Sequence, residues 1–519
     1  MFQFKLNYSL PKRILNLLRL TLLLLVGCFI ILTLKKEPTY ISNFKTYNKN
    51  IIISDLRIEK CWFDCEYQTY QSIEIQSSYF TKWVLLVKYQ PIADNIKILT
   101  DFSFEPFEDQ EGYFIEESKI HNQKVYKKYY LNASEKIDEN LPLIRAIEIL
   151  NGDENFQDHR PYWISSLFPN FMNNKDGIYP YITMMKISDL ECDKFEQEVS
   201  KFSQLKKLNM IDYDESNSSK LKILQISDLH FGLTKGNCDN YLNCRSDLKT
   251  LEFINSTLIN EKPNFIVING DLFDIHRLQQ INSVQLKSIV LKSLQPILKH
   301  KIPFIITFGD SELDYKSDIN DFKIMILNLL STIPYCYNSI PSDQSLHGKT
   351  NYNLLVYNQD KTHLALITIL DSELKVLQES QINLIYRENP ATYKLMFFHY
   401  PISQFRPTGK FKIVGGYNEK HPLISNTNKK FLSDIIKCGY NVLSVGHEHE
   451  NDACLLHEQI DKSIWLCYSG IAGDNGETKI DYHYERRVRL FEIDWQNKKL
   501  FSWKRKESGD KFDYQLIYS

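Results

Sequence analysis

Five short polar clusters in the sequence carry side chains that bind metal ions. They are Asp228-Leu-His230, Gly270-Asp271, Gly309-Asp310-Ser311-Glu312, the single His399, and Gly446-His447-Glu-His449. Carboxylate and imidazole ligands without thiolates suit zinc, manganese and ferrous iron. Two such ions about 3.5–4 Å apart can clamp both oxygens of an in-line phosphoryl displacement and can acidify water. The clusters therefore indicate a two-metal site for phosphoryl chemistry.

Each cluster directly follows an apolar segment that the sequence pattern predicts to be a strand. These segments are residues 221–227, 265–268, 303–308, 395–398 and 441–445. Helical spacing over residues 247–261, 284–299 and 320–330 separates the early strands, which favours βαβ units and a central sheet. Further strands are expected at 363–370, 464–468, 486–494 and 500–504. Ligands of open α/β sheets bind outside the carboxyl ends of the strands, where these clusters would meet.

The first 36 residues differ from the rest of the chain. Residues 20–34 carry no charge, and the apolar stretch extends back to residue 14. A helix of that length would span about 32 Å, enough for a bilayer core of roughly 30 Å. We expect residues 1–36 to be a tail and membrane anchor, with 14–34 as the span; a cleaved signal peptide is the alternative. Residues 37–50 read as a linker.

Between the linker and the polar boundary at residues 204–220, the sequence is rich in β-branched and aromatic residues. Stretches such as IEIQSSYF and KWVLLVKY alternate as half-buried strands do. We expect a smaller β-rich domain over residues 51–205, followed by the metal-centred domain over residues 221–519. The β-rich segment contains no metal-binding constellation of its own.

Composition and cysteine content bear on the compartment and on partners. The 519 residues are 43% hydrophobic and 24% charged, with a net charge of −2, which suits a globular chain and gives no basic field for nucleic acid. Two close cysteine pairs, Cys61 with Cys65 and Cys238 with Cys244, are either disulfides of an oxidising lumen or unpaired. Three sequons, at Asn132, Asn217 and Asn255, lie beyond the anchor. We expect a single-pass protein of the secretory pathway with a lumenal or extracytoplasmic C-terminal domain.

The clusters resemble the calcineurin-like metallophosphoesterase superfamily, whose pattern is D-x-H, G-D-x-x-D/Y, G-N-H-D/E, a single H and G-H-x-H. The resemblance covers about residues 221–506. GHEHEND at 446–452, IWLCY at 464–468 and YERRVRLFEID at 484–494 look like the fungal phosphatases named for dosage-dependent cell-cycle regulation, which are related to a branch of plant purple acid phosphatases. The resemblance implies a four-layer α/β/β/α sandwich.

It also implies a ligand set for two divalent ions, manganese, zinc or ferrous iron. One ion would be held by Asp228, His230, Asp271 and His449, and the other by Asp271, Asp310, His399 and His447, with Asp271 as the bridge. Position 274 is the D/Y site of the family. It is aspartate here, which argues against a purple ferric centre.

The third cluster departs from the family pattern. Asp310 and Ser311 stand where the family has asparagine and histidine, and Glu312 follows them. With two divalent ions, Asp310 lowers the formal charge of the cage from +2 to +1. Ser311 has no pKa near neutrality, so it cannot replace the histidine thought to protonate the leaving oxygen. Glu312 and Asp314 are candidates to substitute for it.

Two functions are therefore expected as alternatives. The first is a metal-dependent phosphatase that acts on phosphomonoesters or phosphoproteins, with Asp271, Asp310, Ser311 and Glu312 at the reacting centre. The second is a weak or inactive protein of the same fold that regulates partners by binding them. No nucleic-acid partner is expected.

Overall fold

The computed structural model describes most of the chain from residue 51 onward. It leaves out residues 1–50, 63–68, 78–80, 93–96, 105–112, 121–123, 133–137, 169–176, 214–218, 237–243, 274–281, 313–318, 342–344, 358–362, 373–374, 386–390, 420, 429, 460–461 and 475–483. The predicted anchor and linker, Asp274 and Asp314 thus lie outside the described residues. In the described ranges, no helix is both long and apolar enough to cross a membrane.

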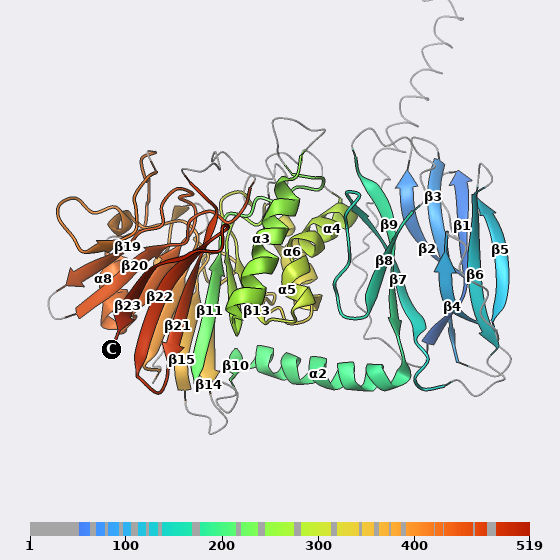
Figure 1. The fold of residues 1–519 in the computed structure, drawn as a ribbon, viewed down its shortest axis with the longest axis horizontal. Helices are drawn as coiled ribbons and strands as arrows, with labels where there is room; N and C mark the ends of the chain where they lie inside the picture. The colour runs from blue at the N-terminus through green and yellow to red at the C-terminus, as the bar shows by residue number, and fades with distance from the viewer. Residues whose placement is uncertain are drawn as a thin grey trace, which may run out of the picture. The chain divides into compact units, whose positions relative to one another are not determined.

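Residues 51–187 form antiparallel strands in three sheets of three (Figure 1). The sheet orders are β1-β3-β2, β4-β6-β5 and β7-β9-β8. The strands are β1 (Ile51–Trp62), β2 (Gln71–Ser77), β3 (Thr81–Pro91), β4 (Lys97–Ser103), β5 (Phe114–Ile120), β6 (Lys124–Asn132), β7 (Leu143–Gly152), β8 (Trp163–Leu167) and β9 (Tyr179–Ile187). One hydrophobic cluster draws on all three sheets, including Leu85, Phe102 and Ile182. This agrees with the strands predicted here.

The β-rich pattern predicted over residues 51–205 ends earlier, because helix α2 occupies Asp189–Lys207. Ser188 and Glu191 form a capping box, in which each side chain bonds the backbone of the other residue. Acidic residues in the first turn and Lys206 and Lys207 in the last turn suit the helix dipole. These local signals form a helix in a stretch interpreted from the sequence as the end of a β-rich segment.

Two larger sheets follow α2. The six-stranded sheet has the order β13-β12-β11-β21-β22-β23, and the eight-stranded sheet has the order β10-β14-β15-β16-β18-β20-β19-β17. The strands are β10 (Met210–Asp212), β11 (Lys220–Ile226), β12 (Phe265–Asn269), β13 (Phe304–Thr307), β14 (Tyr352–Tyr357), β15 (His363–Ile369), β16 (Tyr393–Phe397), β17 (Ile413–Val414), β18 (Val442–Val445), β19 (Cys454–Gln459), β20 (Lys462–Tyr468), β21 (Arg487–Asp494), β22 (Lys499–Lys506) and β23 (Lys511–Tyr518). Every strand predicted here from residue 221 onward is found within a few residues of its predicted bounds.

Helices accompany both sheets. They are α3 (Ser246–Glu261), α4 (Ser283–Ser293), α5 (Gln295–Lys299), α6 (Ile319–Thr332), α7 (Glu379–Ile385) and α8 (Lys430–Lys437), with the 3₁₀ turn η4 (Ser403–Phe405). The single helix predicted over 284–299 is divided at Leu294, because Pro296 is tolerated only in the first turn of a new helix.

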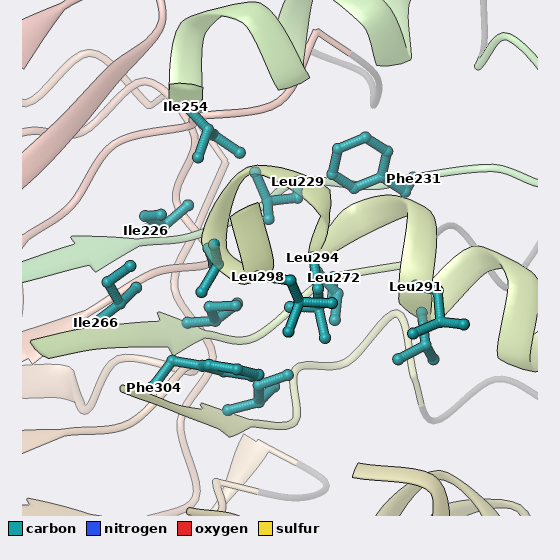
Figure 2. Close-up of a cluster of buried hydrophobic side chains, with 14 of the residues drawn as sticks. Ile226, Leu229, Phe231, Ile254, Ile266, Leu272, Leu291, Leu294, Leu298 and Phe304 are labelled. Atoms are coloured by element: carbon teal, nitrogen blue, oxygen red, sulfur yellow. The ribbon is translucent and has the colours of Figure 1, made fainter. Parts of the chain in front are cut away.

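Three hydrophobic clusters arrange these elements in four layers. In β12, Ile266 and Ile268 face the first cluster with helices α3 to α6, while Phe265 and Val267 face the second, between the sheets. Figure 2 shows the first cluster, with Ile226 and Ile266 of the sheet near Leu294 and Leu298 of the helices. The third cluster joins the other face of the eight-stranded sheet to α7 and α8. Alternating strand faces thus explain why these short strands are apolar throughout.

Candidate metal centre

The predicted ligand residues meet where strands of the two sheets end. Asp228 follows β11, Asp271 follows β12, Asp310 follows β13, His399 follows β16 and His447 follows β18. Their ligand atoms fall into two groups, each with all atoms within 4.8 Å of one another. The groups are Asp228, His230, Asp271 and His449, and Asp271, Asp310, His399 and His447. Asp271 belongs to both groups, the position expected of a bridging carboxylate.

In the first group, two imidazoles face each other across the carboxylates. The Nε2 atoms of His230 and His449 lie 3.3 Å apart. His449 Nε2 is 3.6 Å from Asp228 Oδ1, and His230 Nε2 is 3.7 Å from Asp271 Oδ2. Four donor atoms at these separations could surround one ion of tetrahedral preference.

In the second group, Asp310 links two imidazoles. Its Oδ1 lies 3.0 Å from His399 Nε2 and 2.9 Å from His447 Nδ1, and His399 Nε2 lies 3.4 Å from Asp271 Oδ2. Burial alone would raise the pKa of the Asp310 carboxyl, but hydrogen bonds with His399 and His447 hold that pKa well below its usual range. The carboxylate is therefore ionised and available to a cation.

Asn269, a residue that sequence reasoning overlooked, orients His399. Its backbone carbonyl lies 2.8 Å from His399 Nδ1, which holds a ring proton on Nδ1 and makes Nε2, the nitrogen facing Asp310 and Asp271, the atom that would bind a metal. Its side-chain amide donates to the carbonyls of Phe398 and Ser444, at 3.0 and 3.3 Å. Asn269 thus ties the end of β12 to residues at the ends of β16 and β18. The only sequence signal was a polar residue closing an apolar strand.

The backbone at the site is held in a conformation that side chains rarely adopt. Asp228, His230, Asp271 and His447 have positive φ angles of 57°, 49°, 52° and 67°. Such angles cost energy in residues other than glycine and cluster at functional sites. The amides of Leu229 and His230 both donate to the Asp271 carbonyl, at 2.8 and 2.9 Å. These bonds hold the loops after β11 and β12 together.

Glycine permits the close approach of ligands from different strands. A Cβ atom on Gly270, whose φ is +89°, would lie 2.3 Å from Nδ1 of His399. A Cβ atom on Gly309 would lie 2.0 Å from Oδ1 of Asp271. Both distances are far below van der Waals contact, so a side chain larger than glycine would push His399 or Asp271 away. The glycines of the two G-D pairs thus allow the two groups of ligand residues to share Asp271.

One structural observation, independent of the sequence motifs, also indicates that these residues can bind metal ions. Oδ2 of Asp228 is fully buried and has no hydrogen-bond partner within the part of the chain that the structure describes. A buried carboxylate oxygen without a partner is costly unless a cation neutralises it. Burial would raise the pKa of the Asp271 carboxyl, but the charge of His399 holds it below its usual range. Ionised, buried carboxylates beside imidazoles suit divalent ions.

The two residues that depart from the family pattern have separate surroundings. The Ser311 amide donates to Asp271 Oδ1 at 2.9 Å, and its hydroxyl lies 3.4 Å from His230 Nδ1. Ser311 therefore supports two ligand residues and supplies no acidic group. Asp310 Oδ2 lies 3.8 Å from Nζ of Lys375, a second residue that sequence reasoning missed because no motif surrounds it.

Glu312 was a candidate to replace the missing acid, but its carboxylate is occupied by the backbone. It accepts hydrogen bonds from the amides of Gly309, Asp271, Leu272 and Phe273, at 2.7, 3.1, 2.6 and 3.1 Å. Burial and the charge of Asp271 raise the pKa of Glu312 to about 7. The four backbone hydrogen bonds make Glu312 an anchor for both G-D loops.

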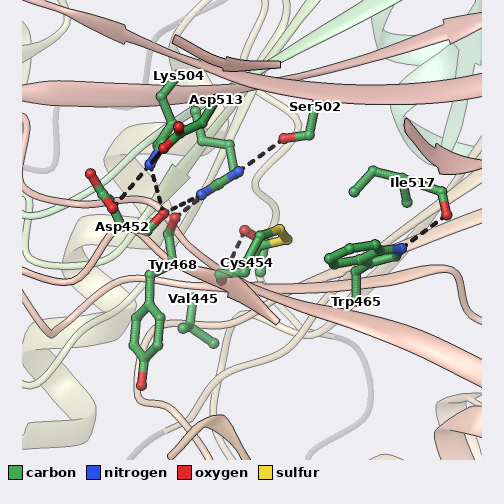
Figure 3. The surroundings of a disulfide bond; sticks show 12 residues. Val445, Asp452, Cys454, Trp465, Tyr468, Ser502, Lys504, Asp513 and Ile517 are labelled. Carbon is green, nitrogen blue, oxygen red and sulfur yellow. Dashed lines mark hydrogen bonds and ion pairs between the residues drawn. A yellow bond between two sulfur atoms is a disulfide. The ribbon is translucent and has the colours of Figure 1, made fainter. Parts of the chain in front are cut away.

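A buried ion-pair network holds the chain just after the G-H-x-H motif. Asp452 pairs with Arg487 and lies 2.9 Å from Lys504 Nζ, whose side chain is fully buried. Figure 3 shows Asp452 and Lys504 of this network beside the disulfide between Cys454 of β19 and Cys467 of β20. Cys61 and Cys244 are also disulfide-bonded. Cys65 and Cys238, the partners suggested by sequence proximity, lie outside the described residues.

Comparison with known proteins adds a family assignment to this geometry. The model of the family described as calcineurin-like phosphoesterase matches residues 221–451. The protein SIA1 of Kluyveromyces lactis is 29% identical over 392 residues, covering 72% of this chain and 63% of the relative. The phosphatase DCR2 of Saccharomyces cerevisiae is 28% identical, covering 58% of this chain and 57% of the relative. These matches confirm the predicted superfamily and branch, although the chain spans only about three fifths of these relatives.

Plant relatives and solved structures also match. An Arabidopsis thaliana protein named "Probable inactive purple acid phosphatase 28" is 26% identical, covering 57% of this chain and 83% of the relative. The solved purple acid phosphatase PPD1 from yellow lupin seeds is 11% identical, with a TM-score of 0.40 over 83% of this chain and 72% of that one. The relatives thus include both a named phosphatase and a protein named as inactive.

Proposed function

Because the chain belongs to the calcineurin-like phosphoesterase family, we propose that it is a metal-dependent phosphatase of phosphomonoesters or phosphoproteins. The observation that carries this proposal is the shared position of Asp271 between two groups of ligand atoms. One carboxylate common to two metal positions can hold two ions close enough to clamp both oxygens of an in-line phosphoryl displacement. Manganese, zinc and ferrous iron all suit the donor set.

The chain's own residues would bind and orient the two ions. Asp228, His230 and His449 would hold one, Asp310, His399 and His447 the other, and Asp271 both. When bound, such ions neutralise phosphoryl oxygens and activate water as a nucleophile. The Asn269 carbonyl holds a ring proton on Nδ1 of His399, so that Nε2 is the atom that would bind a metal, and Glu312 fixes the loops that present Asp271 and Asp310.

The surroundings of position 311 limit the range of substrates. The Ser311 hydroxyl cannot act as a cationic acid, and a general acid contributes typically 10²–10⁴-fold to the rate. Esters whose leaving groups need no protonation, such as aryl phosphates, should therefore react best. Alkyl phosphates should react slowly.

The proposal is tested with aryl-phosphate hydrolysis by the metal-loaded protein. Asp271→Ala should abolish metal-dependent turnover, whereas Asp510→Asn, a change in the exposed turn before β23, should leave it unchanged. A wild-type protein that carries metal but hydrolyses aryl phosphate no faster than Asp271→Ala would refute the proposal.

The second candidate function is that of a catalytically inactive regulator. The serine at position 311 favours it. No protonatable side chain stands at position 311, and a plant relative is named as inactive. This candidate predicts that the protein binds metal without turnover.

We also propose that residues 14–34 attach the chain to a membrane of the secretory pathway, with the metal centre on the lumenal or extracytoplasmic side. The disulfides of Cys61, Cys244 and Cys454 support an oxidising compartment. Retention in the membrane fraction by the full chain, and its loss when residues 1–36 are removed, would support this placement. Protease protection in sealed vesicles tests the side.

A further inference from the structure

We propose that Lys375 binds a phosphoryl oxygen of the substrate at the second metal position and thereby offsets the extra negative charge of Asp310. This inference rests on the proposed function, since it assigns a specificity-determining cation to the same site. Three carboxylates against two divalent ions leave a charge of +1, and the ammonium group of Lys375 returns it to +2. That is the value the cage would have with a neutral residue at position 310.

The geometry places Lys375 on the outer side of Asp310. Oδ1 of Asp310 faces the imidazoles of His399 and His447, whereas Oδ2 lies 3.8 Å from Nζ of Lys375. That distance makes an ion pair and is too long for a hydrogen bond. The three donors of the ammonium group are therefore not consumed by Asp310, and a phosphate oxygen beside Asp310 could accept one of them.

Tyr400 gives the lysine a fixed place next to a ligand. Nζ of Lys375 lies 5.1 Å from the centre of the Tyr400 ring, and that ring lies 4.1 Å from the ring of His447. The Tyr400 side chain is buried, while 47% of the Lys375 side chain is exposed. Cation–π contact and exposure together leave the charge at the edge of the site, open to an incoming anion.

The backbone of Lys375 is pinned in the left-handed region, with a φ of 62°. Its amide donates to the Ser372 carbonyl at 3.1 Å, and its carbonyl accepts the amide of Asn426 at 3.4 Å. The hydroxyl of Ser372 in turn accepts the Tyr400 amide at 2.7 Å. A residue other than glycine in this conformation needs such support. These bonds link the backbone of the lysine, through Ser372, to the chain after His399.

The test is the binding of inorganic phosphate to the metal-loaded protein, measured by calorimetry, with metal content determined on the same samples. Lys375→Met keeps the length of the side chain and removes its charge, and Lys375→Arg keeps the charge. Lys412→Met is the matched control, because Lys412 is an exposed lysine whose Nζ lies 5.5 Å from the Trp465 ring. A charged hydrogen bond of this kind is worth about 10- to 100-fold in affinity.

We expect Lys375→Met to weaken phosphate binding about 10-fold or more with both metals retained, and the other two variants to stay within about 3-fold of wild type. Unchanged phosphate affinity in Lys375→Met, loss of metal in that variant, or no phosphate binding by the wild type would each overturn the inference. Phosphate binding through Lys375 without aryl-phosphate turnover would refute the proposed function alone. Turnover with unchanged constants in Lys375→Met would refute the lysine's role alone.

Discussion

The backbone amide of Ser311 donates a hydrogen bond to Oδ1 of Asp271 at 2.9 Å. The residue that replaces the family histidine therefore still supports the shared carboxylate, because the contact uses main-chain atoms. What the substitution removes is the imidazole itself. Metal binding and proton donation are thus separated at this position, and the two can be tested one at a time.

Ser311→His combined with Asp310→Asn should restore the missing acid and the neutral ligand. We expect alkyl-phosphate hydrolysis to rise by at least about 10-fold, and to rise more than aryl-phosphate hydrolysis, since only poor leaving groups need the proton. The measurement is kcat/KM for both ester classes at equal metal content. If neither rate rises while both metals stay bound, another group already donates the proton.

Asn269→Ala should weaken both the fold and the second ligand group. The change leaves the buried carbonyls of Phe398 and Ser444 without the Asn269 amide, which should cost about 2 kcal/mol of unfolding free energy. Metal affinity should fall about 10- to 100-fold, because the lost side-chain amide holds in place the Asn269 backbone carbonyl that orients His399. Asn497→Ala, in the turn between β21 and β22, removes a comparable side chain elsewhere. Unchanged metal affinity in Asn269→Ala would show that the Asn269 side chain is not needed to position the carbonyl that orients His399.

Gly270→Ala should disrupt the centre, whereas Gly409→Ala should not. Both glycines have positive φ, of +89° and +106°, but a Cβ atom meets His399 only at position 270 and meets nothing within 4 Å at position 409. Gly409→Ala should cost about 1 kcal/mol through its backbone alone. Gly270→Ala should cost more and should lose metal from the second group, measured by thermal unfolding and metal analysis. Equal effects of the two substitutions would contradict the close approach that we describe.

Glu148 of β7 should make stability depend on acid pH. Its carboxylate lies 2.9 Å from Arg160 Nη2 and 2.8 Å from Lys287 Nζ of α4. Burial would raise the pKa of Glu148, but the charges of Arg160 and Lys287 lower it from 4.5 to about 2. Since the folded pKa lies below the unfolded one, this stabilisation is complete above about pH 5 and is lost as the pH falls toward 2.

The measurement is the unfolding free energy of metal-free wild type and of Glu148→Gln between pH 2.5 and 7. The difference between the two proteins should be constant above about pH 5 and should shrink steadily below it. A difference that is independent of pH, or that grows in acid, would contradict this account.

The ligand set could be predicted because each ligand follows a buried strand, and strand ends gather at one edge of a sheet. Asp228, Asp271 and Asp310 are recognisable for this reason, although their role as ligands stays a prediction. Lys375 and Tyr400 were missed, because their positions depend on contacts between loops that no periodic pattern encodes. Asn269 was missed because a single polar residue at a strand end is common.

The fold was predictable to a similar degree. The strand–helix alternation after residue 221 predicted βαβ units with a central sheet, since buried strands and amphipathic helices have distinct spacings, whereas the four layers were implied by the family resemblance. The charged helix α2 was missed, although Ser188 and Glu191 carried a capping signal. Short edge strands such as β17 have too few residues to show a pattern. The register of the two sheets depends on tertiary packing and could not be derived from the sequence.

The central claim is that Asp271 serves two metal positions at once. The direct measurement is the number of manganese or zinc ions bound per chain, by calorimetry and metal analysis, for wild type, Asp271→Ala, His230→Ala and His399→Ala. We predict two ions for wild type, one for each histidine variant, and tight binding of neither ion by Asp271→Ala. Two tightly bound ions in Asp271→Ala, or a single ion in wild type under saturating metal, would contradict the claim.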